Sequence, residues 1–339
     1  MTFEERREAE IKRLQAERAA LPCEEMELTR IGSAEEISIR NGFDPESLAV
    51  FEMGYEGNLY FLYASDIPER VKTSFGSTVS PEADSEYAAL IIEFDWEKQA
   101  IRSERKVLLG RHLYQFHTLL PLGEDFFLCG YRNFFIENEK EQWNAFILDR
   151  SGKLKSSLYL GDGINHLMTT ADRRIIAGYS DEGVFGLYSD EDEEPLGKQG
   201  LVIWDDKGNK VWENQKHEID DMYDLEVDDQ GEIWFYPYMP FDLVHLNRSM
   251  EDTAVSLDIE GSHRFIIAQN RDKVLFGGGY FDENSHYYVY DLGQDTLTGK
   301  RNMLLKCEGR EVTANTSRVN GSKVIFIGED AMLYAARFV

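Results

Sequence analysis

Residues 223–236 read YDLEVDDQGEIWFY, and this stretch decides the fold. It begins with a run in which apolar and polar side chains alternate, which is typical of a half-buried strand. The polar turn Asp228-Asp229-Gln230-Gly231 follows, and a second run rich in aromatic residues completes the pattern. Two such runs joined by a short turn that contains glycine predict a β-hairpin.

The same pattern recurs four more times along the chain. Each copy has an apolar run, a polar turn, and a second run of β-branched and aromatic residues. The last copy turns at Asn320-Gly321, and Asn-Gly is the strongest short-range hairpin signal. The further copies are FHTLLPLGEDFFLCGY at 116–131, NHLMTTADRRIIAGY at 165–179, HRFIIAQNRDKVLFGGGY at 263–280, and the stretch 316–329.

The copies are regularly spaced. With Gly130, Gly178, Tyr236, Gly277 and Ile327 as matching points, successive copies lie 48, 58, 41 and 50 residues apart. Further strands are predicted between the hairpins, at 145–160, 201–213 and 287–292. A repeat of about 40 to 50 residues with four strands is the signature of a β-propeller blade. The sequence therefore predicts an all-β propeller.

The number of blades depends on how the repeats at the two ends of the chain are counted. An earlier repeat lies at 48–105, interrupted by a polar insertion at 65–85, so six blades are expected, with seven as the alternative. The final repeat reaches Val339 after too few strands, so we expect the segment 26–39 to complete it, because a propeller must close its sheet edges. The predicted organisation is a single propeller domain over 23–339 closed by an N-terminal strand.

A short helix is predicted to precede the propeller, over residues 1–22. Thr2 and Glu5 have the spacing of a capping box, and Pro22 ends the helical pattern. The apolar residues of this segment form only a thin stripe, so we expect the helix to lie on the domain surface.

Composition excludes several partners. Thirty-six Lys and Arg against 63 Asp and Glu give a formal net charge of −27. Such a field repels polyanions, so we expect no nucleic acid and no membrane surface as a partner. The three cysteines, Cys23, Cys129 and Cys307, are far apart, which indicates reduced thiols. The N-terminal segment has no apolar run, so we expect a cytoplasmic location. We also expect a monomer.

The middle third of the chain resembles a known family. GDGINHLMTTADRRIIAGYSDEGVFG at 161–186, followed by GLVIWDDKGNKVWE at 200–213, is similar to a family of bacterial β-propellers of unassigned function. Further similarity runs through 219–223, 241–244 and 276–280. The resemblance implies a propeller fold and a bacterial source, and it carries no catalytic residue across.

Candidate site residues follow from the repeat. The innermost strand of each propeller blade lines a central channel, and the loops that enter these strands gather on one face, where ligands bind. Three histidines stand at equivalent entries and could converge into a metal or acid–base site, or they could simply hydrogen-bond the loops. The candidates at these entries are His117, Asp162, Asn165, His166, Asp220, Asp221, Tyr223 and His263.

A second group of candidates follows a predicted strand end. Tyr179 is followed by Asp181 and Glu182 in a turn flanked by glycine. These carboxylates could hold a cation or act as a general base, or they could bond to backbone amides and fix the turn.

Two functions remain open at this point. A non-catalytic binding propeller would hold a protein or a small ligand at the channel face. The alternative is a metal-assisted hydrolase or lactonase-like enzyme with a divalent metal at the channel mouth. No cofactor is predicted for the first function, and no residue is assigned a catalytic role for either.

Overall fold

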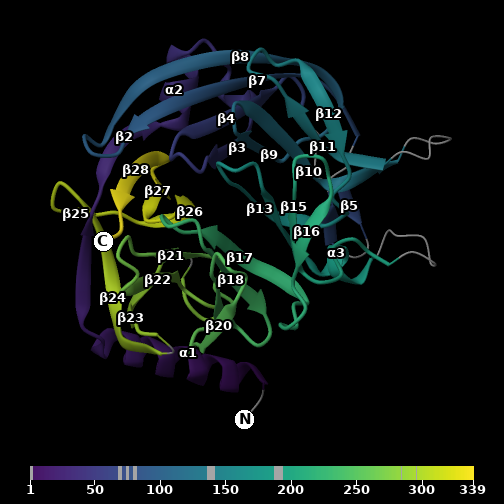
Figure 1. Ribbon diagram of the computed structural model, residues 1–339. Coiled ribbons are helices and arrows are strands. Elements are labelled where there is room, and N and C mark those ends of the chain that lie inside the picture. Colours follow the sequence, from purple (N-terminus) through teal and green to yellow (C-terminus); the bar gives the residue numbers. More distant parts are fainter. Residues whose placement is uncertain are drawn as a thin grey trace. The chain divides into compact units, whose positions relative to one another are not determined.

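Six sheets of four or more strands carry the fold of the computed structural model, which describes residues 3–67, 71–73, 76–78, 82–135, 142–186, 194–283, 285–294 and 296–339. Each sheet is built on a run of consecutive strands, and the protein is a six-bladed β-propeller with an N-terminal helix (Figure 1). The predicted fold class and blade count are therefore confirmed. The chain divides into two compact units.

Unit 2 comprises Ser33–Val227 and Phe235–Pro240. Its first sheet has the order β3-β4-β7-β8, with β3 (Leu48–Met53), β4 (Leu59–Ala64), β7 (Glu82–Asp95) and β8 (Ala100–Tyr114). The second and third sheets contain β9 (Thr118–Leu122), β10 (Asp125–Phe135), β11 (Gln142–Leu148), β12 (Leu154–Leu158), β13 (Ile164–Thr169), β14 (Ile175–Tyr179), β15 (Leu201–Trp204) and β16 (Lys210–Glu213).

The predicted insertion at 65–85 contains the small sheet of β5 (Val71–Thr73) and β6 (Gly76–Thr78). The shorter elements of this unit are α2 (Ala34–Arg40), η1 (Pro45–Ser47) and α3 (Asp181–Phe185). α2 begins with a capping box, in which the Ser33 hydroxyl accepts from the backbone of Glu36 and the Glu36 carboxylate accepts from Ser33. The predicted turn at Asp181 and Glu182 is wrong, because these residues form the first turn of α3.

Unit 1 comprises Met1–Gly32, Asp228–Trp234 and Phe241–Val339. The fourth sheet of the chain has the order β17-β18-β19-β20; its first strand belongs to unit 2, its last two strands belong to unit 1, and β18 has residues in both. Its strands are β17 (Asp221–Val227), β18 (Ile233–Tyr238), β19 (Asp242–Leu246) and β20 (Asp252–Ser256). The last two sheets contain β21 (Phe265–Ile267), β22 (Lys273–Gly277), β23 (Tyr287–Leu292), β24 (Leu297–Cys307), β25 (Arg310–Glu311), β26 (Ala314–Asn320), β27 (Lys323–Gly328) and β28 (Met332–Arg337).

The N-terminal segment adds one strand to each of the last two sheets. β2 (Thr29–Ser33) lies beside β28 and gives the sixth sheet its fourth strand. β1 (Cys23–Glu27) runs parallel to β24 in the fifth sheet, with Met26 opposite Leu305. The strand pairing of β1 was not predicted from the sequence.

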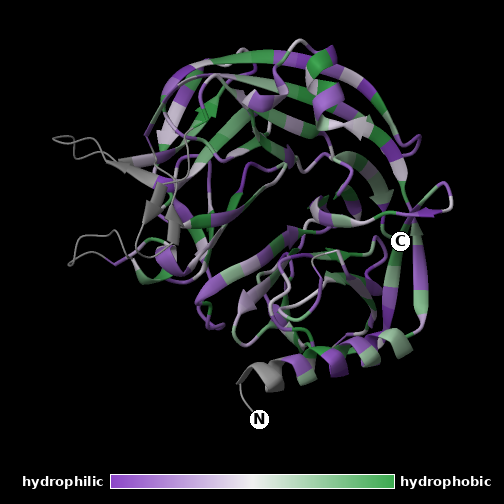
Figure 2. Ribbon diagram, turned by 180° about the vertical axis from the view of Figure 1, so that it is seen from behind, coloured by the Kyte–Doolittle hydropathy of each residue, from purple (hydrophilic) through white to green (hydrophobic). Residues whose placement is uncertain are grey.

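α1 (Phe3–Ala20) lies beside the ends of β23 and β24 (Figure 1). The amide of Asn302 donates to the carbonyl of Arg18 at 2.8 Å, and Arg18 forms an ion pair with Asp282 at 3.4 Å. Most of the helix is hydrophilic, whereas the strands alternate (Figure 2). The predicted capping residue Thr2 lies outside the described residues. No described helix has the combination of length and apolarity that crossing a membrane requires.

Four of the hairpin turns share the same side-chain-to-backbone hydrogen bonds. In each, an oxygen of Asp or Asn accepts two backbone N–H groups, from the second and fourth residues after it. The side chain thereby replaces the ladder hydrogen bonds that the turn cannot make. The four residues are Asp149, Asp205, Asp228 and Asn247. Of these four turns, the one at Asp228 belongs to the hairpin 223–236 from which the repeat was recognised.

Candidate functional site

Five predicted residues come together on loops of unit 2. Asp162 lies in the loop before β13, Asn165 lies at the start of β13, and Asp181 and Glu182 open α3. Asp221 is the first residue of β17. The loops that enter the innermost strands and those that follow the second strands lie on the same face of a propeller, so one face carries all five side chains.

Arg132 organises this group, although the sequence analysis did not single it out. Its guanidinium forms ion pairs with Glu182 at 2.5 Å and with Asp162 at 3.4 Å, and it packs over the ring of Tyr131. Burial lowers the pKa of Arg132, but the hydrogen bond to Glu182 and the two carboxylates outweigh it, so the net direction is upward. The sequence offered one indication of Arg132 as a site residue, which is that this basic residue directly follows the apolar run Phe126–Tyr131.

Hydrogen bonds and a close backbone approach hold the loops together. The Tyr131 hydroxyl lies 2.7 Å from the Ser180 hydroxyl and donates to Glu182 at 3.1 Å. Gly163 has a φ of 68°, and a Cβ there would lie 2.4 Å from the backbone nitrogen of Gly183. Only glycine fits this position without moving α3, so the loop before β13 and the start of α3 form one rigid support.

The carboxyl of Asp221 lies in an acidic environment. It accepts a hydrogen bond from the Asn165 amide at 3.1 Å, and the same amide also donates to the carbonyl of Met222. Burial raises the pKa of Asp221 to about 6, with further contributions from the negative charges of Asp181 and Glu182. No described Lys, Arg or His forms an ion pair with Asp181 or Asp221. The face therefore holds more negative charge than Arg132 neutralises.

The remaining candidates of unit 2 have other surroundings. Nδ1 of His166 lies 3.7 Å from Oδ1 of Asp224, and Nδ1 of His117 accepts the backbone N–H of Tyr131. Tyr223 stacks against Tyr238, with ring centroids 5.5 Å apart. Tyr179 is completely buried, and its hydroxyl donates to the carbonyl of Leu160 and accepts from Trp204. Tyr179 therefore supports the core and offers no group to a ligand.

His263 belongs to unit 1 and lies just before β21. Burial lowers its pKa, and the neighbouring charge of Arg264 lowers it further. His117 and His166 lie in unit 2, whereas His263 lies in unit 1, and the convergence of the three histidines stays a prediction.

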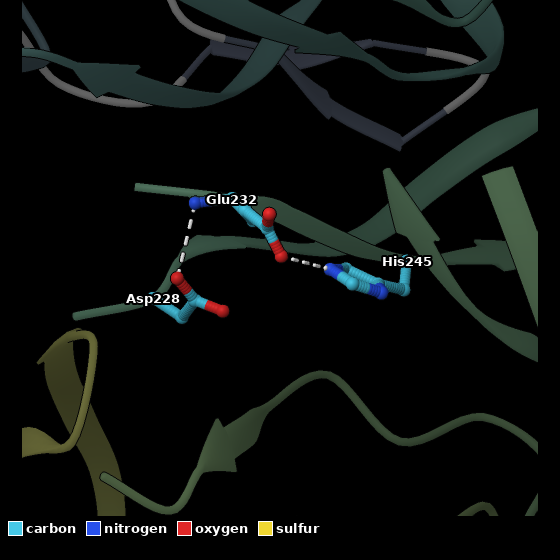
Figure 3. Close-up of side chains that lie close together, drawn as sticks. All are labelled: Asp228, Glu232 and His245. Carbon is cyan, nitrogen blue, oxygen red and sulfur yellow. Dashed lines mark hydrogen bonds and ion pairs between the residues drawn. The ribbon is translucent and has the colours of Figure 1, made fainter. Parts of the chain in front are cut away.

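A group of metal-ligating side chains lies in unit 1. Asp228, Glu232 and His245 bring their ligand atoms within 4.8 Å of one another (Figure 3). Arg271 already supplies the positive charge, with its guanidinium 2.5 Å from Asp228 and 2.6 Å from Glu232. Asp228 also accepts from the indole of Trp234 at 2.8 Å. The group is therefore a filled structural network, in which a cation would have to displace Arg271.

A surface pocket of about 490 Å³ lies at the turns of the first sheet, lined by Asn58, 93–97 and Arg102. The Asp95 carboxylate accepts the backbone N–H groups of Glu97 and Lys98, and the indole of Trp96 donates to the carbonyl of Gly57 at 2.8 Å. These polar groups shape the turns themselves, so the pocket is a poorer candidate than the face around Asp221.

Comparisons with known proteins find similar solved structures and no related sequence. No family model matches the chain, and no curated protein matches it. Among solved structures, Kluyveromyces lactis Hsv2 is 10% identical, with a TM-score of 0.48, covering 86% of this chain and 73% of that one. Virginiamycin B lyase from Staphylococcus aureus is 9% identical, with a TM-score of 0.48, covering 93% of this chain and all of that one. YCF48 bound to D1 peptide is 10% identical, with a TM-score of 0.49, covering 94% and 100%.

Proposed function

We propose that this protein is a non-catalytic binding propeller that holds a positively charged group of a protein or small-molecule partner at the face around Asp221. The observation that carries the proposal is the half-buried Asp221 carboxyl, which lies near Asp181 and Glu182 and has no ion-pair partner among the described residues. A cation placed between Asp181 and Asp221 would relieve the repulsion between them. The net charge of −27 would attract such a partner from a distance.

Binding is favoured over catalysis by the roles of the polar groups. The Ser180 hydroxyl, just before Asp181, is engaged by Tyr131 and by the carbonyl of Gly163. Glu182 is held by Arg132 and Tyr131, so it lacks the freedom that a general base needs. A rigid acidic surface suits recognition of a Lys or Arg side chain.

Calorimetric titration with two blocked amino acids tests the proposal. Nα-acetyl-lysine methylamide is the cationic probe, and Nα-acetyl-norleucine methylamide is the neutral control. We expect only the cationic probe to bind, with an affinity about tenfold lower after Asp221→Asn, because a hydrogen bond to a charged group is worth about 1.5 kcal/mol. Binding should weaken with added salt and as the pH falls through about 6, where Asp221 becomes protonated.

The matched control is Glu46→Gln, which makes the same charge change at an exposed position of unit 2. It should leave the affinity unchanged. Equal binding of both probes, or an unchanged affinity in Asp221→Asn, would overturn the proposal. Stoichiometric divalent metal in the purified protein that is lost in Asp221→Asn would instead support metal-assisted hydrolysis.

A further inference from the structure

β8 is a basic strand in an acidic protein. Its sequence AIRSERKVLLGRHLY contains four basic residues and one Glu, whereas the whole chain carries a net charge of −27. Arg111 forms an ion pair with Asp84 of β7, and Arg102 lines the surface pocket that acidic side chains share. Arg105 and Lys106 are exposed, and no carboxylate in the described part of the chain forms an ion pair with either of them. The middle of β8 therefore presents two adjacent cations to solvent.

The middle of β8 is also an unpaired sheet edge. β8 ends the order β3-β4-β7-β8, and its pairs with β7 run without a shift over 103–108. At the far end of this run, the turn at Gly152 comes close to the Leu108 carbonyl, and His112 bonds to the carbonyl of Leu109. Before Leu108, the backbone of the run has no hydrogen-bond partner outside β7 among the described residues. Such an edge offers N–H and C=O groups with which another strand can pair.

The open edge, defined as residues 103–107, carries its two cations on opposite faces. Successive side chains of a strand alternate between the two faces of a sheet. Arg105 packs over the ring of Phe126, 5.7 Å from its centroid, and Lys106 packs over the ring of Phe43 at 5.0 Å. These ring contacts hold the two side chains beside the backbone of the edge, and they leave the charges without a neighbouring anion.

Few acidic groups lie near the open edge. Glu104, between the two cations, forms an ion pair with Arg40. On β7, Glu93 lies opposite Ser103, and residues 89–92, opposite the remainder of the open edge, are uncharged. Positive charge is therefore in excess here, in contrast to the acidic face around the first residue of β17.

We propose that the open edge binds an extended segment of a partner protein that contains two consecutive acidic residues and adds a strand beside β8. The backbones of the two strands would pair, and the two acidic side chains, one on each face, would lie opposite Arg105 and Lys106. A second copy of this chain suits the edge poorly, because two β8 strands would bring their cations together. Cations on an edge strand also keep other chains away, a role that predicts no binding of such a segment.

Fluorescence anisotropy with labelled peptides tests this site on the whole protein. The probe is the blocked peptide Val-Thr-Glu-Glu-Thr-Thr, and Val-Thr-Gln-Gln-Thr-Thr is the control for charge. A third peptide keeps the Glu side chains but is N-methylated at its backbone amides, so it cannot donate hydrogen bonds to a strand. We expect only the first peptide to bind, more weakly with added salt, and to slow hydrogen exchange of the backbone amides at 103–107.

Variants test the contribution of each side chain. Arg105→Gln and Lys106→Gln each remove one cation, and we expect about fivefold weaker binding from each. Leu108→Asp places an acid at the end of the edge, where Leu108 is 77% exposed, and should weaken binding about tenfold; it is the second variant if the first two fail to fold. Val211→Asp is its matched control, because Val211 is 44% exposed on β16, the outer strand of another sheet. Val211→Asp and Asp221→Asn should both leave the affinity unchanged.

Several outcomes would overturn the open edge as a binding site. The Glu-Glu peptide would fail to bind, or would bind no better than the Gln-Gln or the N-methylated peptide. An affinity that Arg105→Gln, Lys106→Gln and Leu108→Asp all leave unchanged would also refute it. Loss of binding in Asp221→Asn would place the peptide away from β8, and self-association of the protein that Leu108→Asp abolishes would show that a second copy occupies the edge.

Discussion

Replacement of Asp221 by Asn should stabilise the protein at neutral pH. The native pKa of this carboxyl is raised from 3.8 to about 6, so the folded state holds the proton more tightly than the unfolded chain does. Stability from this group is therefore present at low pH and is lost as the pH rises from about 4 to about 6. Full ionisation would cost about 3 kcal/mol at 1.36 kcal/mol per pKa unit.

The actual cost is smaller than this value, because the Asp221 side chain is only half-buried and water screens the neighbouring charges. We expect Asp221→Asn to raise the free energy of unfolding by about 1–2 kcal/mol at pH 7.5. The introduced Asn side chain can still accept the hydrogen bond from Asn165, so the substitution does not remove this interaction.

Urea denaturation of the parent and Asp221→Asn between pH 5 and pH 8 measures this difference. The gain should be largest above pH 7 and shrink toward pH 5. Asp205→Asn is the control. Hydrogen bonds from Asn209 and Lys207 lower the pKa of Asp205, so this substitution should lower the free energy of unfolding at neutral pH. A loss of stability in Asp221→Asn at pH 7.5, or a gain that does not change with pH, would refute the electrostatic account of this site.

Three further predictions concern other buried groups. Arg132→Met leaves the carboxylates of Asp162 and Glu182 without their cation, and we expect a loss of about 3 kcal/mol in urea denaturation; a loss below 1 kcal/mol would contradict this. Arg271→Ala frees Asp228 and its neighbours, so equilibrium dialysis should show zinc uptake that the parent lacks, and equal uptake would refute the filled network. Cys129 is fully buried with a raised pKa, so a thiol reagent should modify exposed Cys23 and reach Cys129 only after unfolding.

The repeat made the fold predictable. Hairpin turns such as Asp228-Asp229-Gln230-Gly231 depend on local side-chain hydrogen bonds, so their residues can be read from a short window. The strand predicted at Tyr287–Leu292 has these bounds in the structure. The pairing of β1 with β24 left no local signal, because it joins Cys23–Glu27 to residues about 280 positions later.

The sequence predicted only those site residues that lie at equivalent positions of the repeats. Asp162, Asn165 and Asp221 were found because they open strands of successive repeats, where loops converge. Arg132 and Glu226 lie within strands, and a strand pattern gives no reason to expect a buried charge. In β17 the alternation indicated burial of Leu225 and Val227, yet Glu226 between them is buried as well, because the strand is covered on both faces.

The placement of β2 beside β28 affects how the chain reaches its native state. The sixth sheet cannot acquire its fourth strand until Met332–Arg337 has been synthesised, some 300 residues after Thr29–Ser33. During that interval β2 must stay unpaired without joining another sheet edge, and the loop to be closed is one of the longest that the chain can form. Assembly of this sheet should therefore be a late and slow step in folding, and exposed edges of β28 would be the place where unfinished molecules associate.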